Sequence, residues 1–238
     1  MGVAARNPIE LTYYSSSNIL AALPMGFVSA LLVRTRPVCL ARSKVLFHKG
    51  DQGDGCYWLQ AGIVKVTVSS GQDLDRILAI LGPGAIVGEL SVIDGQPRSA
   101  TVEALTDCRL LFVSRSSFLE RLRQEDGIYD KLAEALAGRL RQADDEVATA
   151  TGLTVKARLA RALLQLTEHL GEVNGSEFVT IHLTLRQNDL AAMAGTARES
   201  ASRTIANWKR KQIVKELSPY RYAVNVCRLQ VEARKASL

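Results

Sequence analysis

Short β-branched segments separated by turn residues fill the hydrophobic pattern of residues 37–113. These segments are Val45–Phe47, Tyr57–Gln60, Ile63–Val68, Ile77–Leu81 and Thr101–Val113. Turn signals interrupt them about every 8–12 residues, which is typical of an antiparallel sheet that closes or rolls on itself. The interruption after residues 85–87 is long enough for a loop and a short helix. The pattern therefore predicts a closed or rolled antiparallel sheet with one such insertion.

From Ser116 the pattern changes to the periodicity of helices. Residues 130–151 carry an apolar stripe with steps of three and four residues. Its members are Leu132, Leu136, Leu140, Ala143, Val147 and Ala150. A helix of this length between two domains cannot bury its stripe on one domain alone, so the stripe predicts a two-stranded homodimer interface. The alternative is a helix that packs only within its own chain.

A second domain is predicted to begin at Gly152, with a helix over residues 154–170 and a short strand over residues 178–183. Its tail, residues 212–226, has two short apolar segments around Ser218-Pro219. Two apolar segments separated by a proline turn predict a β-hairpin wing.

Two short helices separated by a turn at Gly195 are predicted between this strand and the wing. We expect Thr184 and Thr196 to be their N-caps, because a threonine hydroxyl accepts a hydrogen bond from the first helical turn. The core-facing side chains of the second helix are expected to be Ala201, Ile205 and Trp208. The outward-facing ones are expected to be Arg198, Glu199, Ser202 and Arg203.

The apolar run Ile19–Val33 is 15 residues long and is broken by Pro24 and Gly26. A membrane span needs about 20 apolar residues, and no convincing small-residue cleavage site follows the run. We expect this run to form N-terminal helices that pack on the first domain, with residues 1–17 frayed. No membrane partner is expected, and the expected location is the cytoplasm.

The net charge of +6 is unevenly distributed along the 238 residues. Residues 152–238 hold 14 Lys and Arg against 7 Asp and Glu, whereas residues 1–151 hold 16 against 17. The positive charge therefore belongs to the second domain, as expected for a domain that meets a polyanion.

Four cysteines and three histidines are scattered along the chain. Metal and iron–sulfur sites need clustered ligands, and a disulfide framework is not expected in a chain of this size. We find no nucleophile–base set and no Walker-type loop, so no catalytic residues are predicted and an enzyme is not expected.

The segment from Gly88 to Val102 combines groups that suit a bound sugar phosphate. Arg98 can form a forked, charge-assisted pair with phosphate oxygens, and Ser99 with nearby backbone N–H groups can complete the cradle. Glu89 can accept a hydrogen bond from a sugar hydroxyl. The alternative is a glycine-rich β-turn followed by a surface arginine.

Gly-Glu-Leu at residues 88–90 and Arg-Ser-Ala at residues 98–100 resemble the phosphate-binding cassette of the cyclic-AMP receptor protein (CRP/FNR) family of bacterial transcription regulators. The resemblance covers about residues 19–226 and implies an α+β fold. The implied parts are a cyclic-nucleotide-binding double-stranded β-roll (19–115), a dimerisation helix region (116–151) and a winged helix-turn-helix DNA-binding domain (152–238).

The implied ligand-binding residues are Leu78, Gly88, Glu89, Leu90, Ser91, Arg98, Ser99, Ala100, Ala143 and Asp144. Cyclic-AMP-binding members of the family carry adjacent Thr and Ser on the dimer helix, where this chain has Ala143 and Asp144. Asp144 can accept a hydrogen bond from an exocyclic amine, so a purine remains possible without the two hydroxyls. The expected effector is cyclic AMP, with cyclic GMP, cyclic di-GMP or no nucleotide left open.

An FNR-type oxygen sensor would need an N-terminal cysteine cluster, and residues 1–36 contain no cysteine. A haem-bearing branch would need axial ligands, and nothing favours that role for His48 over a structural one. We therefore expect the protein to carry no metal, haem or iron–sulfur cluster.

An outward Arg-Glu pair followed by an arginine suits the major groove, because arginine is bidentate to guanine and glutamate accepts from cytosine. The block resembles the recognition helix of the same family, Arg-Glu-x-x-x-Arg. The implied DNA-binding residues are Arg186, Gln187, Thr196, Arg198, Glu199, Ser200, Ser202 and Arg203. Ser202 looks like the serine of FNR-type members, which leaves the half-site open between TGTGA-like and TTGAT-like.

Together these features predict a homodimeric transcription factor on palindromic double-stranded DNA, with RNA polymerase as a further expected partner. A cyclic nucleotide bound in the β-roll would reposition the long helix and present the two recognition helices one DNA turn apart. One alternative is a ligand-independent regulator of the same architecture. Another is a cyclic-nucleotide-binding regulatory subunit that acts on a partner protein, against which the basic second domain argues.

Overall fold

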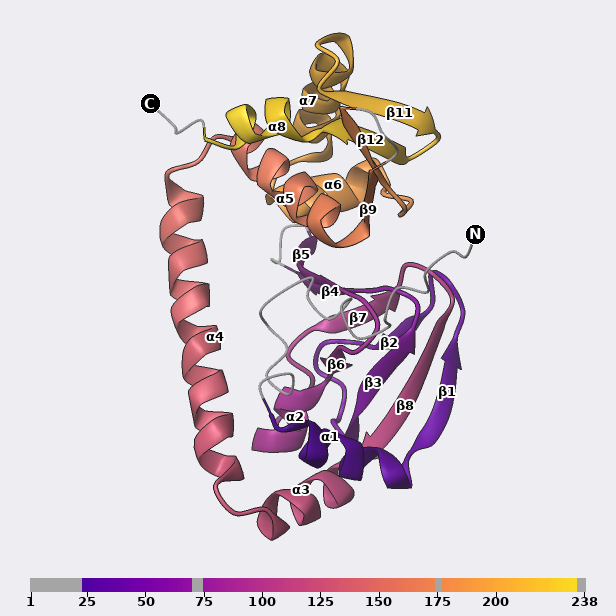
Figure 1. Ribbon diagram of the computed structural model, residues 1–238, viewed down its shortest axis with the longest axis vertical. Helices are drawn as coiled ribbons and strands as arrows, with labels where there is room; N and C mark the ends of the chain where they lie inside the picture. The colour runs from indigo at the N-terminus through magenta and orange to yellow at the C-terminus, as the bar shows by residue number, and fades with distance from the viewer. Residues whose placement is uncertain (1–22, 70–74, 174–176, 235–238) are drawn as a thin grey trace, which may run out of the picture. The chain divides into compact units, whose positions relative to one another are not determined.

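Two four-stranded sheets form the first part of the chain in the computed structural model, which describes residues 23–69, 75–173 and 177–234 (Figure 1). One sheet has the strand order β1-β8-β3-β6 and the other β2-β7-β4-β5. The strands are β1 (Arg36–Leu40), β2 (Val45–Phe47), β3 (Gly55–Ala61), β4 (Val64–Ser69), β5 (Asp75–Leu81), β6 (Ile86–Val87), β7 (Thr101–Ala104) and β8 (Cys108–Ser114). The expected β-roll and the α+β fold class are confirmed.

The segment Thr101–Val113, predicted as one strand region, is two strands that belong to different sheets. The backbone leaves β7 after Ala104, where the hydroxyl of Thr106 accepts a hydrogen bond from the N–H of Ile63 at 2.9 Å. The carboxylate of Asp107 accepts from the N–H of Arg42 at 2.8 Å. These partners are distant in sequence and the turn contains no glycine or proline, so the hydrophobic pattern alone did not show the break.

The space between the two sheets is filled by apolar side chains. The buried members of this cluster are Phe47, Leu59, Val64, Ala79, Leu81, Ala85, Val87, Val102, Ala104, Cys108 and Leu110. They come from strands of both sheets or from the residues beside them, which is why the alternating segments of the sequence close on each other.

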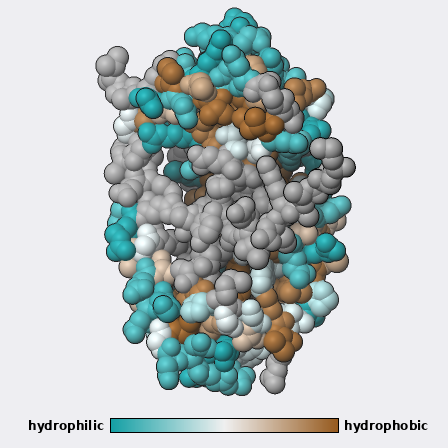
Figure 2. Space-filling view, in the orientation of Figure 1, coloured by the Kyte–Doolittle hydropathy of each residue, from teal (hydrophilic) through white to brown (hydrophobic). Residues whose placement is uncertain are grey.

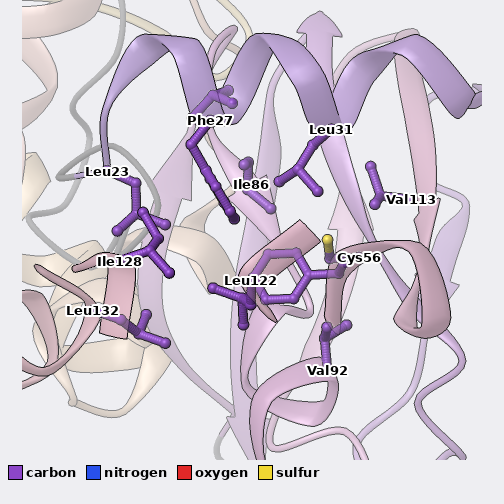
Figure 3. Close-up of a cluster of buried hydrophobic side chains, with 12 residues drawn as sticks. Leu23, Phe27, Leu31, Cys56, Ile86, Val92, Val113, Leu122, Ile128 and Leu132 are labelled. Atoms are coloured by element: carbon purple, nitrogen blue, oxygen red, sulfur yellow. The ribbon is translucent and has the colours of Figure 1, made fainter. Parts of the chain in front are cut away.

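A second cluster joins α1 (Met25–Leu31) to α3 (Arg115–Gln124) and the start of α4 (Ile128–Thr151) (Figure 3). The ring of Phe27 meets the ring of Phe118 edge to face, with 6.1 Å between the centroids. The expected packing of the N-terminal apolar run on the first domain is thus confirmed for its described part, which also includes the short helix η2 (Leu32–Arg34). Residues 1–22 lie outside the described chain. No described helix is long and apolar enough to cross a membrane.

Helix α4 (Ile128–Thr151) is the predicted long helix, 24 residues in length. The side chains of its apolar stripe differ in how far they are buried. Leu132 is buried in the second cluster and Leu136 packs partly against it, whereas Leu140 is 64% exposed. Val147 and Ala150 lie where side chains are not described. The intramolecular core therefore covers the first turns of the stripe and leaves Leu140 uncovered in the single chain.

The chain divides into two compact units, residues 1–66 with 79–142 and residues 67–78 with 143–238. The remaining elements are α5 (Val155–Leu170), β9 (Gly171–Val173), β10 (Phe178–Ile181), α6 (Gln187–Ala194), α7 (Arg198–Arg210), β11 (Val214–Ser218), β12 (Arg221–Asn225) and α8 (Val226–Ala233). The sheet order β11-β12-β10-β9 contains the predicted wing hairpin. Helix α8 was not predicted; its N-cap is Asn225, whose side chain accepts from the N–H of Arg228 at 3.0 Å.

Both predicted N-caps of the helix pair were wrong. Helix α6 begins after Arg186, whose N–H donates to the carboxylate of Asp189 at 2.9 Å, so an acidic side chain inside the first turn takes the role expected of Thr184. Helix α7 begins after Ala197, one residue beyond Thr196, and has no side-chain cap. The turn at Gly195 is confirmed, with φ 56° and ψ 50° in the left-handed region that glycine adopts at little cost.

Candidate functional site

The insertion predicted in the β-roll is a single short helix, α2 (Glu89–Asp94), with a glycine at each end. Gly88 has φ 81° and Gly95 has φ 73°, which side chains other than glycine rarely adopt. The side chains of Glu89 and Ser91 are buried although both are polar. Ser91 lies against Gly53, where an added Cβ would come within 2.2 Å of the Ser91 Cβ. The helix is therefore fitted closely onto the turn that precedes β3.

Arg98 is buried, with 3% of its surface exposed. Its Nη1 donates a hydrogen bond to the carbonyl of Gly88 at 2.9 Å, and its Nη2 lies 3.3 Å from a carboxylate oxygen of Asp54. The guanidinium carbon lies 4.3 Å from the centre of the Phe47 ring and 5.9 Å from that of Tyr57. A buried positive charge is costly unless it is paired, and aromatic faces offset only part of that cost.

The Nε of Arg98 is buried and has no hydrogen-bond partner among the described residues. Nε and Nη2 point their N–H groups along the same edge of the guanidinium, the edge that grips two oxygens of one carboxylate or phosphate. Asp54 contacts Nη2, whereas the N–H of Nε has no partner among the described residues. The site therefore retains a buried donor that can bind an oxygen of an anion.

The surroundings of Arg98 keep the Cys56 thiol and the Tyr57 phenol neutral. The thiol of Cys56 is fully buried, and its pKa is raised to about 12, first by burial and then by the negative charge of Glu89. Burial also raises the pKa of the half-buried Tyr57 hydroxyl. Arg98 opposes both shifts, as a nearby positive charge must.

The predicted ligand residues fall into two groups. The structure brings Gly88 and Arg98 into direct contact, and Glu89, Leu90, Ser91, Ser99 and Ala100 lie on the same insertion or its return. Ser99 is exposed and Ala100 is buried. Leu78 is exposed on β5, and Ala143 and Asp144 are exposed on α4. These three residues belong to the second unit, whereas Arg98 belongs to the first.

Sequence reasoning missed the residues that surround Arg98 from the preceding turn and strands. Phe47, Asp54 and Tyr57 all contact the guanidinium. The Gly53-Asp54-Gly55 stretch lies between the predicted segments Val45–Phe47 and Tyr57–Gln60, where the pattern predicts only a turn. A buried arginine needs a carboxylate or an aromatic face nearby, and that requirement was the one signal that could have led to these residues.

The helix pair α6–α7 presents the predicted DNA-binding surface. In α7, Ala201, Ile205 and Trp208 are buried as predicted, and Arg198, Glu199 and Arg203 are exposed. On α6, Arg186 is exposed and Gln187 is partly buried. The surface around the far end of α7, residues 209–212, is hydrophilic in the space-filling view (Figure 2). Basic and polar groups therefore face outward while one apolar side holds the helix on the domain.

Ser202 does not point freely outward as predicted. It is partly buried, and its hydroxyl donates a hydrogen bond to Oε1 of Gln187, so it links the second helix of the pair to the first. Ser200 is partly buried as well; its hydroxyl accepts from Nη2 of Arg203 at 3.5 Å. Thr196, in the turn, is partly buried.

Arg158, which sequence reasoning did not select, fixes the turn of the helix pair. Its Nε donates to the carbonyl of Ala194 at 2.8 Å, and its Nη1 donates to the carbonyl of Leu153 at 2.9 Å. It therefore ties the start of α5 to the end of α6, where a positive charge also favours the helix C-terminus. The helical spacing of residues 154–170 gave no sign of these partners.

Comparison with known proteins connects both sites to one family. Residues 37–125 match the cyclic nucleotide-binding domain, and residues 157–230 match the Crp-like helix-turn-helix domain. The chain is 35% identical over 165 residues to the cyclic AMP receptor protein of Thermus thermophilus, which covers 69% of this chain and 72% of the relative.

Two solved structures share the fold. FixK2 from Bradyrhizobium japonicum has a TM-score of 0.71 at 21% identity, with 86% of this chain and all of that chain covered. The c-di-GMP responsive global regulator CLP from Xanthomonas campestris has a TM-score of 0.68 at 20% identity, with 84% of this chain and 99% of that chain covered.

The β-roll with its buried arginine and the basic helix pair together define a ligand-responsive, DNA-binding transcription regulator. The chain belongs to the CRP/FNR family. Proteins of this family regulate transcription and are not enzymes.

Proposed function

We propose that the chain is a homodimer that binds palindromic DNA through α7 and binds cyclic AMP in its β-roll. The single observation that carries the nucleotide part is the buried Nε of Arg98, which has no hydrogen-bond partner among the described residues. A cyclic phosphate has two free oxygens and one negative charge, which matches the unfilled Nε and the weakly held Nη2. The buried Glu89, on the same insertion, is the acceptor proposed for the ribose hydroxyl.

The dimer proposal rests on the division of the α4 stripe. Leu132 and Leu136 pack on their own domain, but Leu140 stays exposed on the same stripe. A second copy of α4 would cover it, and the small side chain of Ala143 would let the two helices approach closely. Asp144, exposed on the same helix, is the proposed contact to the purine amine.

The DNA proposal rests on the exposed side chains at the start of α7. Arg198, Glu199 and Arg203 are proposed to read base edges, and Arg186 to contact backbone or flanking bases. Thr196, Ser200 and Gln187 are proposed to lie at the DNA surface beside them. RNA polymerase is proposed as the protein partner of the bound dimer, and the cytoplasm as the location.

A ligand-independent regulator of the same architecture is the second candidate. One observation favours it: Arg98 has a carboxylate partner within its own chain, Asp54. In that case the insertion would have only a structural role, and the affinity for DNA would not change when nucleotide is added.

Calorimetric titration of the full chain with cyclic AMP, cyclic GMP and cyclic di-GMP tests the proposal. Binding of cyclic AMP that is lost in Arg98→Ala and reduced in Arg98→Lys supports it, because lysine cannot fork onto two oxygens. DNA binding that is equal with and without each nucleotide would support the second candidate. The c-di-GMP arm is included because CLP, which shares the fold, responds to that molecule.

A further inference from the structure

The ion pair between Arg98 and Asp54 is strongly asymmetric. The Arg98 side chain is 2% exposed, whereas the Asp54 side chain is 70% exposed. The arginine is therefore fixed inside the protein and the aspartate approaches it from solvent. The contact is also loose, because Nη2 and the carboxylate oxygen are 3.3 Å apart, longer than usual for a charge-assisted hydrogen bond.

The backbone around Asp54 is fixed even though its carboxylate is not. The backbone carbonyl of Asp54 accepts from the N–H of Arg115 at 2.8 Å. On either side, Gly53 lies against Ser91, and an added Cβ on Gly55 would come within 2.2 Å of the Val113 carbonyl. Moving the carboxylate away from Arg98 thus requires rotation of one exposed side chain and no movement of the chain.

The turn that carries Asp54 is also joined directly to Arg98. The N–H of Gly50 donates to the carbonyl of Arg98, and the N–H of Arg98 donates to the carbonyl of Asp51, both at 2.8 Å. These bonds keep the aspartate within reach of the guanidinium whenever no other anion is present.

A phosphate that grips Arg98 through Nε and Nη2 requires Nη2, the nitrogen that Asp54 now contacts. The carboxylate and the phosphate are both negative, so each disfavours the other at the same guanidinium. We propose that Asp54 is an internal competing counter-ion, which neutralises Arg98 in the empty state and which the phosphate of a cyclic nucleotide displaces. Asp54 thereby sets the nucleotide concentration at which the regulator responds. The inference rests on the proposed nucleotide site.

Two variants, Asp54→Asn and Asp54→Ala, test this proposal by calorimetry with cyclic AMP, cyclic GMP and cyclic di-GMP. Both remove the competing charge, so each should bind the nucleotide about three- to tenfold more tightly than the wild type. Both should also have a lower Tm without nucleotide, because the buried guanidinium has lost its counter-ion. Asp126→Asn, which neutralises an exposed aspartate in the turn before α4, is the matched control and should change neither quantity.

The outcomes separate this proposal from the one on which it rests. If the wild type binds a nucleotide and both variants bind it equally or more weakly, Asp54 positions Arg98 or is irrelevant, and the counter-ion proposal is overturned while the nucleotide site stands. If the variants bind a nucleotide that the wild type does not detectably bind, the proposal is supported. If no protein binds any of the three nucleotides, the proposed function fails and this inference fails with it.

Discussion

The guanidinium of Arg98 occupies the space that a side chain on Gly88 would need. Its Nη1 donates to the Gly88 carbonyl at 2.9 Å, and a Cβ built on Gly88 would lie 2.4 Å from that nitrogen. The two ends of the insertion are therefore matched to each other: a residue without a side chain at one end allows a buried arginine from the other.

Gly88→Ala should therefore weaken both the fold and nucleotide binding. The positive φ alone should cost about 1–2 kcal/mol of folding free energy, and the clash should displace Arg98 in addition. Gly127→Ala is the control, because Gly127 also has a positive φ, 72°, but nothing lies within 4 Å of its added Cβ. Thermal unfolding would measure the stability of both variants, and nucleotide titration would measure their affinity for nucleotide. Equal nucleotide affinity in the two variants would contradict the close fit at Gly88.

Removing Arg198 or Arg203 should change base preference as well as DNA affinity. If each reads a guanine, its replacement by alanine should cost about 1–3 kcal/mol on the preferred site and relax discrimination at one base pair. Arg210→Ala removes an exposed positive charge from the other end of α7 and should leave base preference unchanged. Competition binding with single-base variants of a palindromic site distinguishes the cases. A uniform loss on all sequences, with a shallower salt dependence, would mean that the two arginines contact only phosphate.

Ser202 and Gln187 should act on DNA recognition as one unit. Their hydrogen bond joins α7 to α6, so Ser202→Ala and Gln187→Ala should each loosen the placement of α7 in the same way. We expect a coupling energy of about 0.5–1.5 kcal/mol in a double-mutant cycle of DNA affinity. Additive effects, with a loss of preference at one base pair only for Ser202→Ala, would instead make Ser202 a direct base reader.

Cys56 should resist alkylation in the folded protein. Its pKa of about 12 means that roughly one thiol in ten thousand is ionised at pH 8, and only the thiolate reacts. The exposed Cys39 and Cys227 should react first. Burial raises the pKa of Cys108, so the alkylation of Cys108 should also be slow. Mass spectrometry of protein treated with iodoacetamide, before and after unfolding, would follow each thiol. Rapid labelling of Cys56 in the folded chain would show that the second apolar cluster, to which Cys56 belongs, is open to solvent.

Asp144→Ser should strengthen cyclic AMP binding and reduce its selectivity over cyclic GMP. A carboxylate accepts hydrogen bonds only, so it favours the adenine amine over a carbonyl, but its charge opposes an anionic ligand. A serine keeps an acceptor, adds a donor and removes the charge. Titration of both nucleotides into both proteins is the measurement. If affinity and selectivity are both unmoved, Asp144 is a solvated surface charge and the purine contact comes from another residue.

The local pattern of the sequence was enough to place most elements. The segments Val45–Phe47 and Ile77–Leu81 lie within or coincide with strands, and the stripe from Leu132 to Ala150 lies on one helix. Gly195 marked the turn between the two helices, where φ is positive, and the spacing of Ala201, Ile205 and Trp208 identified the buried side of α7. These properties depend on steric limits and on periodicity, which act over a few residues and are therefore visible in the sequence alone.

Tertiary structure decided which polar groups meet. It brought Asp54 to Arg98 across 44 positions, joined Ser202 to Gln187, and started α6 after Arg186, whose N–H donates to Asp189, instead of at the expected cap Thr184. It also divided the α4 stripe between a buried Leu132 and an exposed Leu140. Polar side chains such as aspartate, serine and glutamine have several possible partners of similar strength. Their final choice depends on which groups packing brings within about 3 Å and shields from water, and that is a property of the folded chain.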